Sequence, residues 1–222
     1  NNHMASAIRF EGAVRRDGPQ HVIGPVDLAA TPGQCAALVG PNGCGKSTMI
    51  RVAAGSEPQD DGIVQVLGAR PRQASPDFRG RVLVLDETSF FPDLTVREHL
   101  ELTAVGHGLG KETAQHVEEA LIRCRLSRHA DMNPSRLSKG LQQLMSIAVM
   151  LLPPTAEVLL LHEPERHLDD EAKGWLPTVL AQRKADGVCL LLATHYRPFV
   201  DALADEVFAF DTRGQNTDRG QE

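Results

Sequence analysis

Gly40-Pro41-Asn42-Gly43-Cys44-Gly45-Lys46-Ser47-Thr48 is the stretch that decides the fold. It matches the pattern G-x-x-x-x-G-K-[ST], follows the short apolar run Cys35–Val39, and opens a helical stretch from about Lys46. A glycine-rich turn between a buried strand and a helix directs backbone N–H groups inward, beside the positive end of the helix, and so forms a cradle for phosphate. Lys46 is expected to reach the β and γ phosphates, and Ser47 to ligate Mg²⁺. The stretch therefore predicts a nucleoside-triphosphate site.

Cys44 lies inside this loop, and two interpretations of its thiol stay open. The helix N-terminus and Lys46 both favour a thiolate, which would make Cys44 reactive. Alternatively, Cys44 is a small side chain that fills space in the loop. Protection of the thiol by nucleotide would support the first interpretation.

Strands and helices alternate from this loop onward. Short aliphatic runs typical of buried parallel strands lie at Val158–Leu161 and Val188–Ala193, and Val82–Leu85 and Val207–Phe210 indicate two further strands. Helical spacing of apolar residues marks 111–126 and 141–152, and Thr95–Glu98 has the pattern of a capping box. Residues 7–30 suggest short antiparallel strands, and Gly62–Leu67 a further strand. The predicted fold class is α/β, with a mainly parallel core sheet, a small antiparallel β subdomain and a helical subdomain.

The composition fits a soluble globular chain of 222 residues and 24.1 kDa. Lys and Arg total 23 against 29 Asp and Glu, a net charge of −6, and this acidic balance disfavours a nucleic-acid partner. No apolar run approaches the ~18 residues that a membrane-spanning helix needs. The four cysteines form no C-x-x-C pair, so we expect neither a disulfide framework nor a zinc site, as in a reducing cytoplasm.

The two ends of the chain differ from its body. Residues 1–4 lack the charged and then apolar start of a secretory signal and look like a cloning remnant that runs up to a native Met4. Residues 212–222 are polar, and we expect them to form a flexible tail. Residues 5–211 are expected to form the domain, with its helical subdomain at about 90–137.

Five further features follow the loop in a fixed order. They are a strand with an acidic pair and Phe-Pro-Asp-Leu-Thr at 82–95, the helix opening Leu137-Ser138-Lys139-Gly140-Leu141, the strand Leu159–Pro164 that ends in a carboxylate, Leu168-Asp169, and Thr194-His195. With the loop, they resemble the nucleotide-binding domain of ATP-binding cassette (ABC) transporters over about residues 7–211. The resemblance implies a P-loop NTPase fold of ABC type, with ATP and Mg²⁺ as cofactors.

The resemblance also gives two strand-end side chains a catalytic role. A carboxylate at Glu163, beside the phosphate loop, can orient or deprotonate the water that attacks the γ-phosphate. Its alternative is a helix cap or an ion pair. His195 could contact the γ-phosphate and hold the attacking water, where the alternative is a purely structural histidine.

Ser138, Lys139 and Gly140 present a hydroxyl and backbone N–H groups at a helix start, a second place for an anion. Ser138 is also expected to cap that helix locally. In the family this segment closes over the nucleotide held by the other subunit of a head-to-tail dimer, and Asp169 matches the loop that links the two sites. The resemblance therefore implies a second nucleotide-binding domain as partner, in a homodimer or a heterodimer.

Three positions depart from the family pattern. His162 stands where the family has an Asp that supports Mg²⁺ through bound water, and a neutral imidazole brings no negative charge. Leu141 stands where a Gln is usual. By spacing, Asp86 stands where the family has another glutamine, and Glu87 is the neighbouring candidate for that position. We hypothesise that Asp86 restores the negative charge missing at His162 near the metal. Independent drift in a weakened ATPase is the alternative.

The resemblance implies an ATP-hydrolysing subunit whose nucleotide-driven dimerisation powers a separate membrane-spanning transporter subunit. Such a subunit is cytoplasmic and peripheral, at the inner face of the cell membrane. The departures keep a second hypothesis open, a nucleotide-binding regulatory subunit with little or no hydrolysis. A family member acting on nucleic acid or ribosomes is disfavoured by the acidic balance, and a GTPase by the absence of an Asn-Lys-x-Asp motif.

Overall fold

The computed structural model describes residues 5–85 and 90–211, and the chain divides into two compact units. The first unit comprises Asn1–Val84, Glu157–Glu163 and Leu180–Glu222, and the second comprises Leu85–Ala156 and Pro164–Val179. Residues 1–4, the expected tail at 212–222 and the candidate metal residue Asp86 lie outside the described residues.

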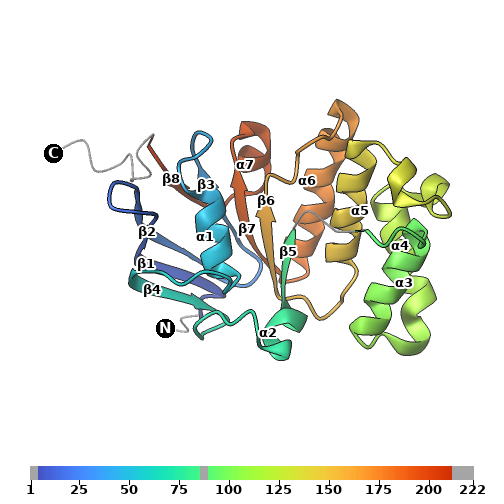
Figure 1. The fold of residues 1–222 in the computed structure, drawn as a ribbon, viewed down its shortest axis with the longest axis horizontal. Coiled ribbons are helices and arrows are strands. Elements are labelled where there is room, and N and C mark those ends of the chain that lie inside the picture. Colours follow the sequence, from blue (N-terminus) through green and yellow to red (C-terminus); the bar gives the residue numbers. More distant parts are fainter. Residues whose placement is uncertain (1–4, 86–89, 212–222) are drawn as a thin grey trace. The chain divides into compact units, whose positions relative to one another are not determined.

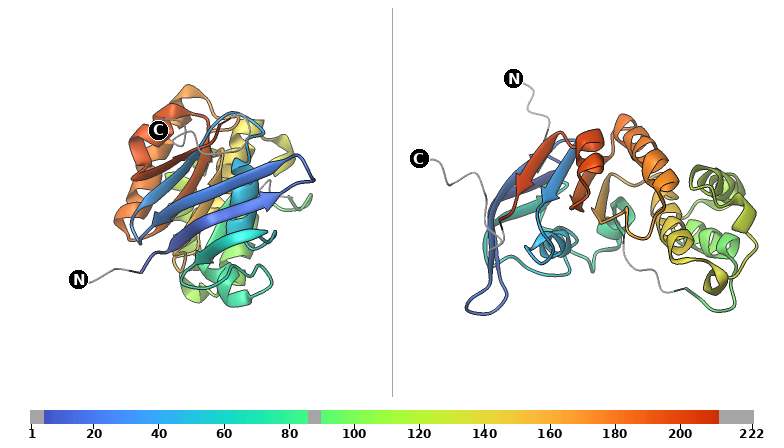
Figure 2. Two further views of the ribbon diagram at one scale, coloured as in Figure 1. Left: turned by 90° about the vertical axis from the view of Figure 1, so that its left-hand side faces the viewer. Right: turned by 90° about the horizontal axis from the view of Figure 1, so that it is seen from above.

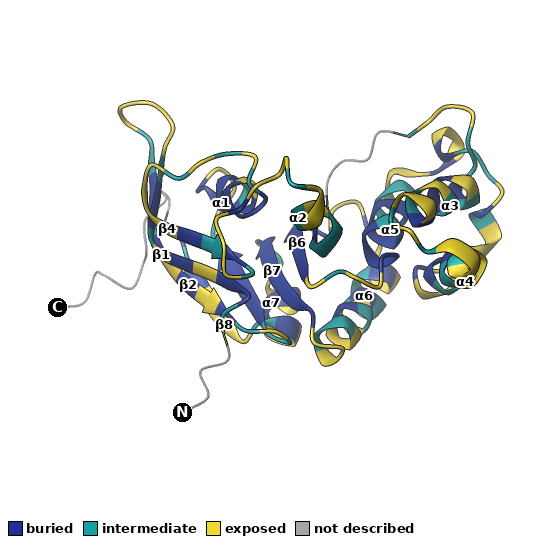
Figure 3. Cartoon of the chain, turned by 90° about the horizontal axis from the view of Figure 1, so that it is seen from below, coloured by how far each residue is buried: buried dark blue, intermediate teal, exposed yellow. Residues whose placement is uncertain are grey.

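The first unit contains a five-stranded sheet with the strand order β5-β6-β7-β3-β8 (Figure 1). Its strands are β3 (Cys35–Val39), β5 (Val82–Leu85), β6 (Val158–His162), β7 (Cys189–Thr194) and β8 (Glu206–Ala209). Because β6, β7 and β3 pair in parallel, their carboxyl ends meet at one edge, where His162 is paired with Ala193 and Val39 with Thr194. Every residue of β7 is buried, as expected for a central parallel strand (Figure 3).

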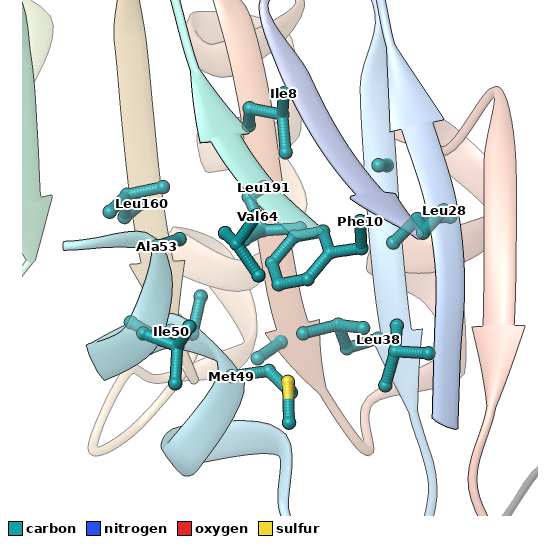
Figure 4. Close-up of a cluster of buried hydrophobic side chains, with 14 of the residues drawn as sticks. Ile8, Phe10, Leu28, Leu38, Met49, Ile50, Ala53, Val64, Leu160 and Leu191 are labelled. Carbon is teal, nitrogen blue, oxygen red and sulfur yellow. The ribbon is translucent and has the colours of Figure 1, made fainter. Parts of the chain in front are cut away.

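A second, antiparallel sheet has the order β2-β1-β4, from β1 (Ile8–Arg16), β2 (Val22–Ala30) and β4 (Asp61–Val66). Figure 2 shows these strands as a layer beside the parallel strands. Alternation along β1 points Ile8 and Phe10 into a core that also takes side chains from α1 (Lys46–Ala53), among them Met49 and Ile50 (Figure 4). The predicted combination of a parallel core sheet and a small antiparallel sheet is confirmed.

Three helices were not predicted from the sequence: α2 (Pro76–Arg81), α6 (Asp170–Ala185) and α7 (Arg197–Leu203). α6 holds a proline, Pro177, in its interior. A proline there removes one backbone hydrogen bond and argues against a helix when the sequence is taken alone. The buried side chains Ala172, Leu176 and Leu180 lie four residues apart and provide the packing that retains the helix.

The second unit is built from α3 (Val96–Gly106), α4 (Thr113–Arg123), α5 (Lys139–Leu151) and the first part of α6. The predicted capping box at the start of α3 is confirmed, since Thr95 Oγ1 accepts from Glu98 N–H at 3.2 Å and Glu98 Oε2 accepts from Thr95 N–H at 2.6 Å. Short 3₁₀ turns lie at Gly110–Glu112, Ser127–His129 and Pro134–Arg136. Within residues 5–85 and 90–211, no helix combines the length and apolar character needed to cross a lipid bilayer.

Candidate functional site

The loop between β3 and α1 has a backbone that only glycine adopts readily. Gly40, Gly43 and Gly45 have φ values of 148°, 78° and 114°. An added Cβ at Gly45 would overlap Cγ2 of the buried Ile23 and lie 3.0 Å from its Cγ1. Gly45 is therefore required both by its backbone conformation and by the close approach of β2.

The ammonium group of Lys46 lies inside this loop. Lys46 is 4% exposed, and its Nζ donates to the carbonyl oxygens of Gly40 at 2.6 Å and Pro41 at 2.8 Å. The first turn of α1 contains no acidic residue, so nothing there offsets the positive end of the helix. The buried charge and the helix start together make the loop a binding place for an anion such as a phosphate chain.

Cys44 packs inward from the loop. It is 1% exposed and belongs to the core cluster, and its Sγ lies 3.7 Å from Lys46 Nζ. This burial favours the space-filling interpretation of the thiol, since a reactive cysteine needs access to solvent as well as a cationic neighbour.

Glu163 follows the last residue of β6 with a left-handed backbone, φ 46°. Its N–H donates to Ala193 O at 2.8 Å, which ties it to the neighbouring strand β7. Its carboxylate is 11% exposed, and Oε1 lies 3.2 Å from Nδ1 of His195. A non-glycine residue at positive φ costs about 1–3 kcal/mol, and such strain is found where geometry serves a function. The two side chains singled out as catalytic are thus in direct contact.

His195 also faces the phosphate loop. A cavity of about 340 Å³ is lined by Val39, Gly40, Pro41, Thr194, His195, Arg197 and Val200. Thr194 Oγ1 accepts from Tyr196 N–H at 2.9 Å and fixes the turn that presents His195. The imidazole is 57% exposed, so it can reach a ligand in the loop while it holds Glu163.

Arg197 is a cavity residue that the sequence analysis missed. It opens α7 and forms an ion pair with Asp201 at 3.0 Å. The signal was a cation three residues beyond Thr194, the last residue of a strand. The sequence does not show that α7 begins beside the phosphate loop, and only this placement makes Arg197 a candidate for contact with a ligand.

Ser47 and His162 are the described candidates for holding a metal. Ser47 is in the first turn of α1, and His162 is the last residue of β6. The described residues contain no group of three or more His, Cys, Asp or Glu side chains that could hold a metal ion by themselves. A cation here would therefore take most of its ligands from a nucleotide and few from the protein, which suits the metal of a metal–nucleotide complex.

The second unit brings together the other four candidates. A cavity of about 350 Å³ is lined by Ser138, Lys139, Gly140, Leu141, Leu144, His167, Leu168, Asp169 and Ala172. Ser138 Oγ accepts from Leu141 N–H at 3.2 Å and caps α5, and Asp169 Oδ1 accepts from Ala172 N–H at 2.8 Å at the start of α6. The starts of both helices thus open into one cavity.

The first turn of α5 closely approaches the loop that precedes α6. A Cβ added to Gly140 would lie 2.7 Å from the carbonyl oxygen of His167, so only glycine fits. His167 has φ 62°, and the sequence analysis did not single it out. The close approach of His167 to Gly140 could not be predicted, because nothing in the sequence relates these two positions.

The family model described as ABC transporter matches residues 23–166. The Nod factor export ATP-binding protein I of Ralstonia nicotianae is 32% identical over 92% of this chain and 64% of its own length. The Spermidine/putrescine import ATP-binding protein PotA of Nitratidesulfovibrio vulgaris is 31% identical over 90% of this chain and 55% of its own length. The chain thus spans less than two thirds of these curated relatives.

Solved structures agree with this match. An ATP-binding subunit of an ABC transporter, 27% identical, superposes with a TM-score of 0.83 over 95% of this chain and 88% of that chain. A dimeric ATP-binding cassette bound to ADP and Pi is 21% identical and has a TM-score of 0.81 over 95% of this chain and 96% of that chain. At that lower identity the similarity concerns the fold alone.

Proposed function

The chain belongs to the ABC transporter family, and on that premise we propose that it is an ATP-binding and ATP-hydrolysing subunit of an ABC transporter. The observation that carries hydrolysis is the contact of 3.2 Å between Glu163 Oε1 and His195 Nδ1. It lies at the sheet edge where the phosphate loop begins. A carboxylate held by an imidazole beside a phosphate cradle is suited to activate water.

The phosphate chain binds in the loop Gly40–Ser47. Inward N–H groups and the start of α1 receive its oxygens, and the buried Thr48 lies in the first turn of α1. Lys46 exchanges the carbonyl oxygens of Gly40 and Pro41 for phosphate oxygens. Its ammonium group then lies against the charge that develops during cleavage.

Glu163 receives the proton of the attacking water or orients that water by a hydrogen bond. His195 keeps the carboxylate in place through Nδ1 and contacts the γ-phosphate through the rest of its exposed ring. Ser47 and His162 would hold the cation that accompanies the nucleotide. When bound, that cation neutralises charge on the phosphate oxygens.

The cavity in the second unit is the proposed contact with a second nucleotide-binding domain. Ser138, Lys139 and Gly140 would contact the nucleotide held by that domain, and Asp169 would link the two sites. Dimerisation on ATP binding would drive a membrane-spanning partner subunit. Because the chain would dock on that subunit, we propose that it lies at the cytoplasmic, inner face of the membrane. One relative is named for export and another for import. Their names support a role in transport but do not indicate its direction.

Phosphate release by the purified chain tests hydrolysis. We expect Glu163→Gln to lower kcat by about 10²–10⁴-fold while nucleotide affinity stays close to wild type. Glu171→Gln is the matched control, because Glu171 pairs with Arg125 in the second unit, whereas the phosphate loop belongs to the first. Full turnover in Glu163→Gln would contradict the proposed role of the carboxylate.

The same assay decides between hydrolysis and a purely regulatory role. The departures at His162, Asp86 and Leu141 motivate the regulatory alternative, since each differs from the residue that the family pattern has there. Tight nucleotide binding by the wild-type chain, with no phosphate release alone or with its transporter partner, would favour it.

A further inference from the structure

His162 occupies the sheet edge that carries the phosphate loop. It is the last residue of β6 and is paired with Ala193, one residue before the Thr194 that pairs with Val39 at the start of the loop. It is half-buried. His162 is thus one strand beyond β7 from the strand that leads into the loop, and is level with Leu38, two residues before Gly40.

His162 also lies on the face of the sheet that α1 covers. Val158 and Leu160 belong to the core cluster that contains Ile50 and Ala53 of α1, and Figure 4 shows Leu160 beside these two residues. Side chains two residues apart in a strand share a face, so the row Val158, Leu160, His162 runs along α1 to the edge.

The first turn of α1 lies at that same edge. α1 begins directly after the loop that leaves the carboxyl end of β3, and it packs on β6. Its first turn carries Ser47. A hydroxyl and an imidazole therefore share one edge and one face, next to the place where the phosphates bind.

This pair of protein ligands differs in chemistry from a hydroxyl and a carboxylate. Mg²⁺ is a hard cation that prefers oxygen and releases its water reluctantly. Imidazole nitrogen suits borderline divalent ions, and affinity for a nitrogen site rises from Mn²⁺ to Co²⁺. Within residues 5–85 and 90–211, no group of three or more His, Cys, Asp or Glu side chains could hold a metal ion by itself.

We propose that His162 binds the cation of the metal–nucleotide complex through its imidazole nitrogen, and that the site consequently binds Co²⁺, a borderline cation, and to a lesser degree Mn²⁺, more tightly than Mg²⁺. This inference rests on the proposed nucleotide site. It assigns a cation class to that site and makes residue 162 the position that selects the class.

Calorimetric titration of ATP into the full chain, with Mg²⁺, Mn²⁺ or Co²⁺ in excess, measures the preference. In wild type we expect nucleotide to bind more tightly with Mn²⁺ or Co²⁺ than with Mg²⁺. In His162→Asp we expect the ratio of the Mg²⁺ and Mn²⁺ dissociation constants to fall by about ten-fold or more, because exchange of a group that supports a metal changes affinity by about 10–100-fold. His116→Asp, the same exchange on α4, should leave the ratio unchanged.

Pulsed electron paramagnetic resonance on the Mn²⁺–nucleotide complex tests the ligand directly. We expect nitrogen hyperfine coupling of the size of a bound imidazole in wild type and in His195→Ala, and its loss in His162→Asp and His162→Asn. If a variant at 162 does not fold, the wild-type spectrum decides, because the absence of nitrogen coupling there overturns the inference.

The outcomes separate the two proposals. Absence of nucleotide binding with all three cations would refute the proposed nucleotide site. Nucleotide binding with equal or higher affinity in Mg²⁺, and with the same ratio in His162→Asp, would refute the cation preference alone and leave the nucleotide site standing.

Discussion

Replacement of Gly45 by alanine gives the sharpest test of how the phosphate loop is built. Gly45 has φ 114°, and its missing Cβ would overlap the side chain of Ile23, which is 1% exposed. A residue other than glycine at such a positive φ costs about 1–3 kcal/mol of folding free energy. Forcing a methyl group into a packed core costs about 1–3 kcal/mol more. We therefore expect Gly45→Ala to lower the free energy of unfolding by about 2–6 kcal/mol.

Gly43→Ala is the matched control. Gly43 also has a positive φ, 78°, but an added Cβ there would meet nothing within 4 Å. Its replacement carries the backbone cost alone, about 1–3 kcal/mol. The difference between the two variants isolates the overlap with Ile23.

Urea unfolding followed by circular dichroism measures these values. In the double variant Ile23→Ala/Gly45→Ala the overlap is gone, so the two changes should couple favourably by about 1–3 kcal/mol relative to the sum of the single variants. Equal losses in Gly45→Ala and Gly43→Ala, with no coupling to position 23, would refute the close approach of β2 to the loop.

Three further predictions concern other parts of the molecule. Thr95→Ala removes the cap of α3 and should lower the free energy of unfolding by about 0.5–2 kcal/mol in urea titrations, whereas Thr95→Ser should retain most of it; equal losses would count against the capping box. Burial raises the pKa of Cys35 and of Cys189 to about 12. Mass spectrometry should therefore find both thiols unlabelled by maleimide in the folded chain at neutral pH and labelled in urea, and rapid labelling of folded protein would contradict their burial. Burial raises the pKa of Asp205, but hydrogen bonds from Lys184 and from the Cys35 N–H, with the charge of Lys184, outweigh it and hold that pKa below its usual value. The carboxylate thus adds stability above its unfolded-state pKa, and this stability is lost as pH falls through the lower folded-state pKa. Asp205→Asn should accordingly lower Tm at neutral pH but not in strong acid, and an equal difference at both would contradict this.

Much of the fold could be predicted because its strands are short aliphatic runs between turns. Cys35–Val39 and Val82–Leu85 have the predicted bounds, and Val158–His162 is one residue longer than predicted. The helix α6 was missed because Pro177 argues against it locally, while the packing of Leu176 and Leu180 that retains it is a tertiary effect.

The residues of the candidate site could be predicted from the sequence, but the contacts between them could not. Glu163 and His195 could each be placed at the end of a strand, but their contact depends on β6 and β7 being neighbours, and strand order is set by long-range pairing. The close approach of Gly140 to His167 likewise joins the start of α5 and the loop before α6, which nothing in the sequence relates. Arg197 became a candidate only through its place in a cavity.

The change of backbone conformation at the end of β6 separates the proposed roles of two adjacent residues, cation binding by His162 and water activation by Glu163. His162 is still in the strand and continues the row of Val158 and Leu160 on the face that α1 covers. Glu163 leaves the strand through a left-handed conformation, is fixed by its N–H to Ala193, and meets His195. Because the contact with His195 is made after the strand has ended, an exchange at 162 should alter the proposed cation site without displacing the carboxylate that we propose activates water. The family's acidic residue can therefore be lost at 162 while the Glu163–His195 contact is retained, and cation choice and water activation should respond independently to mutation at these two neighbouring positions.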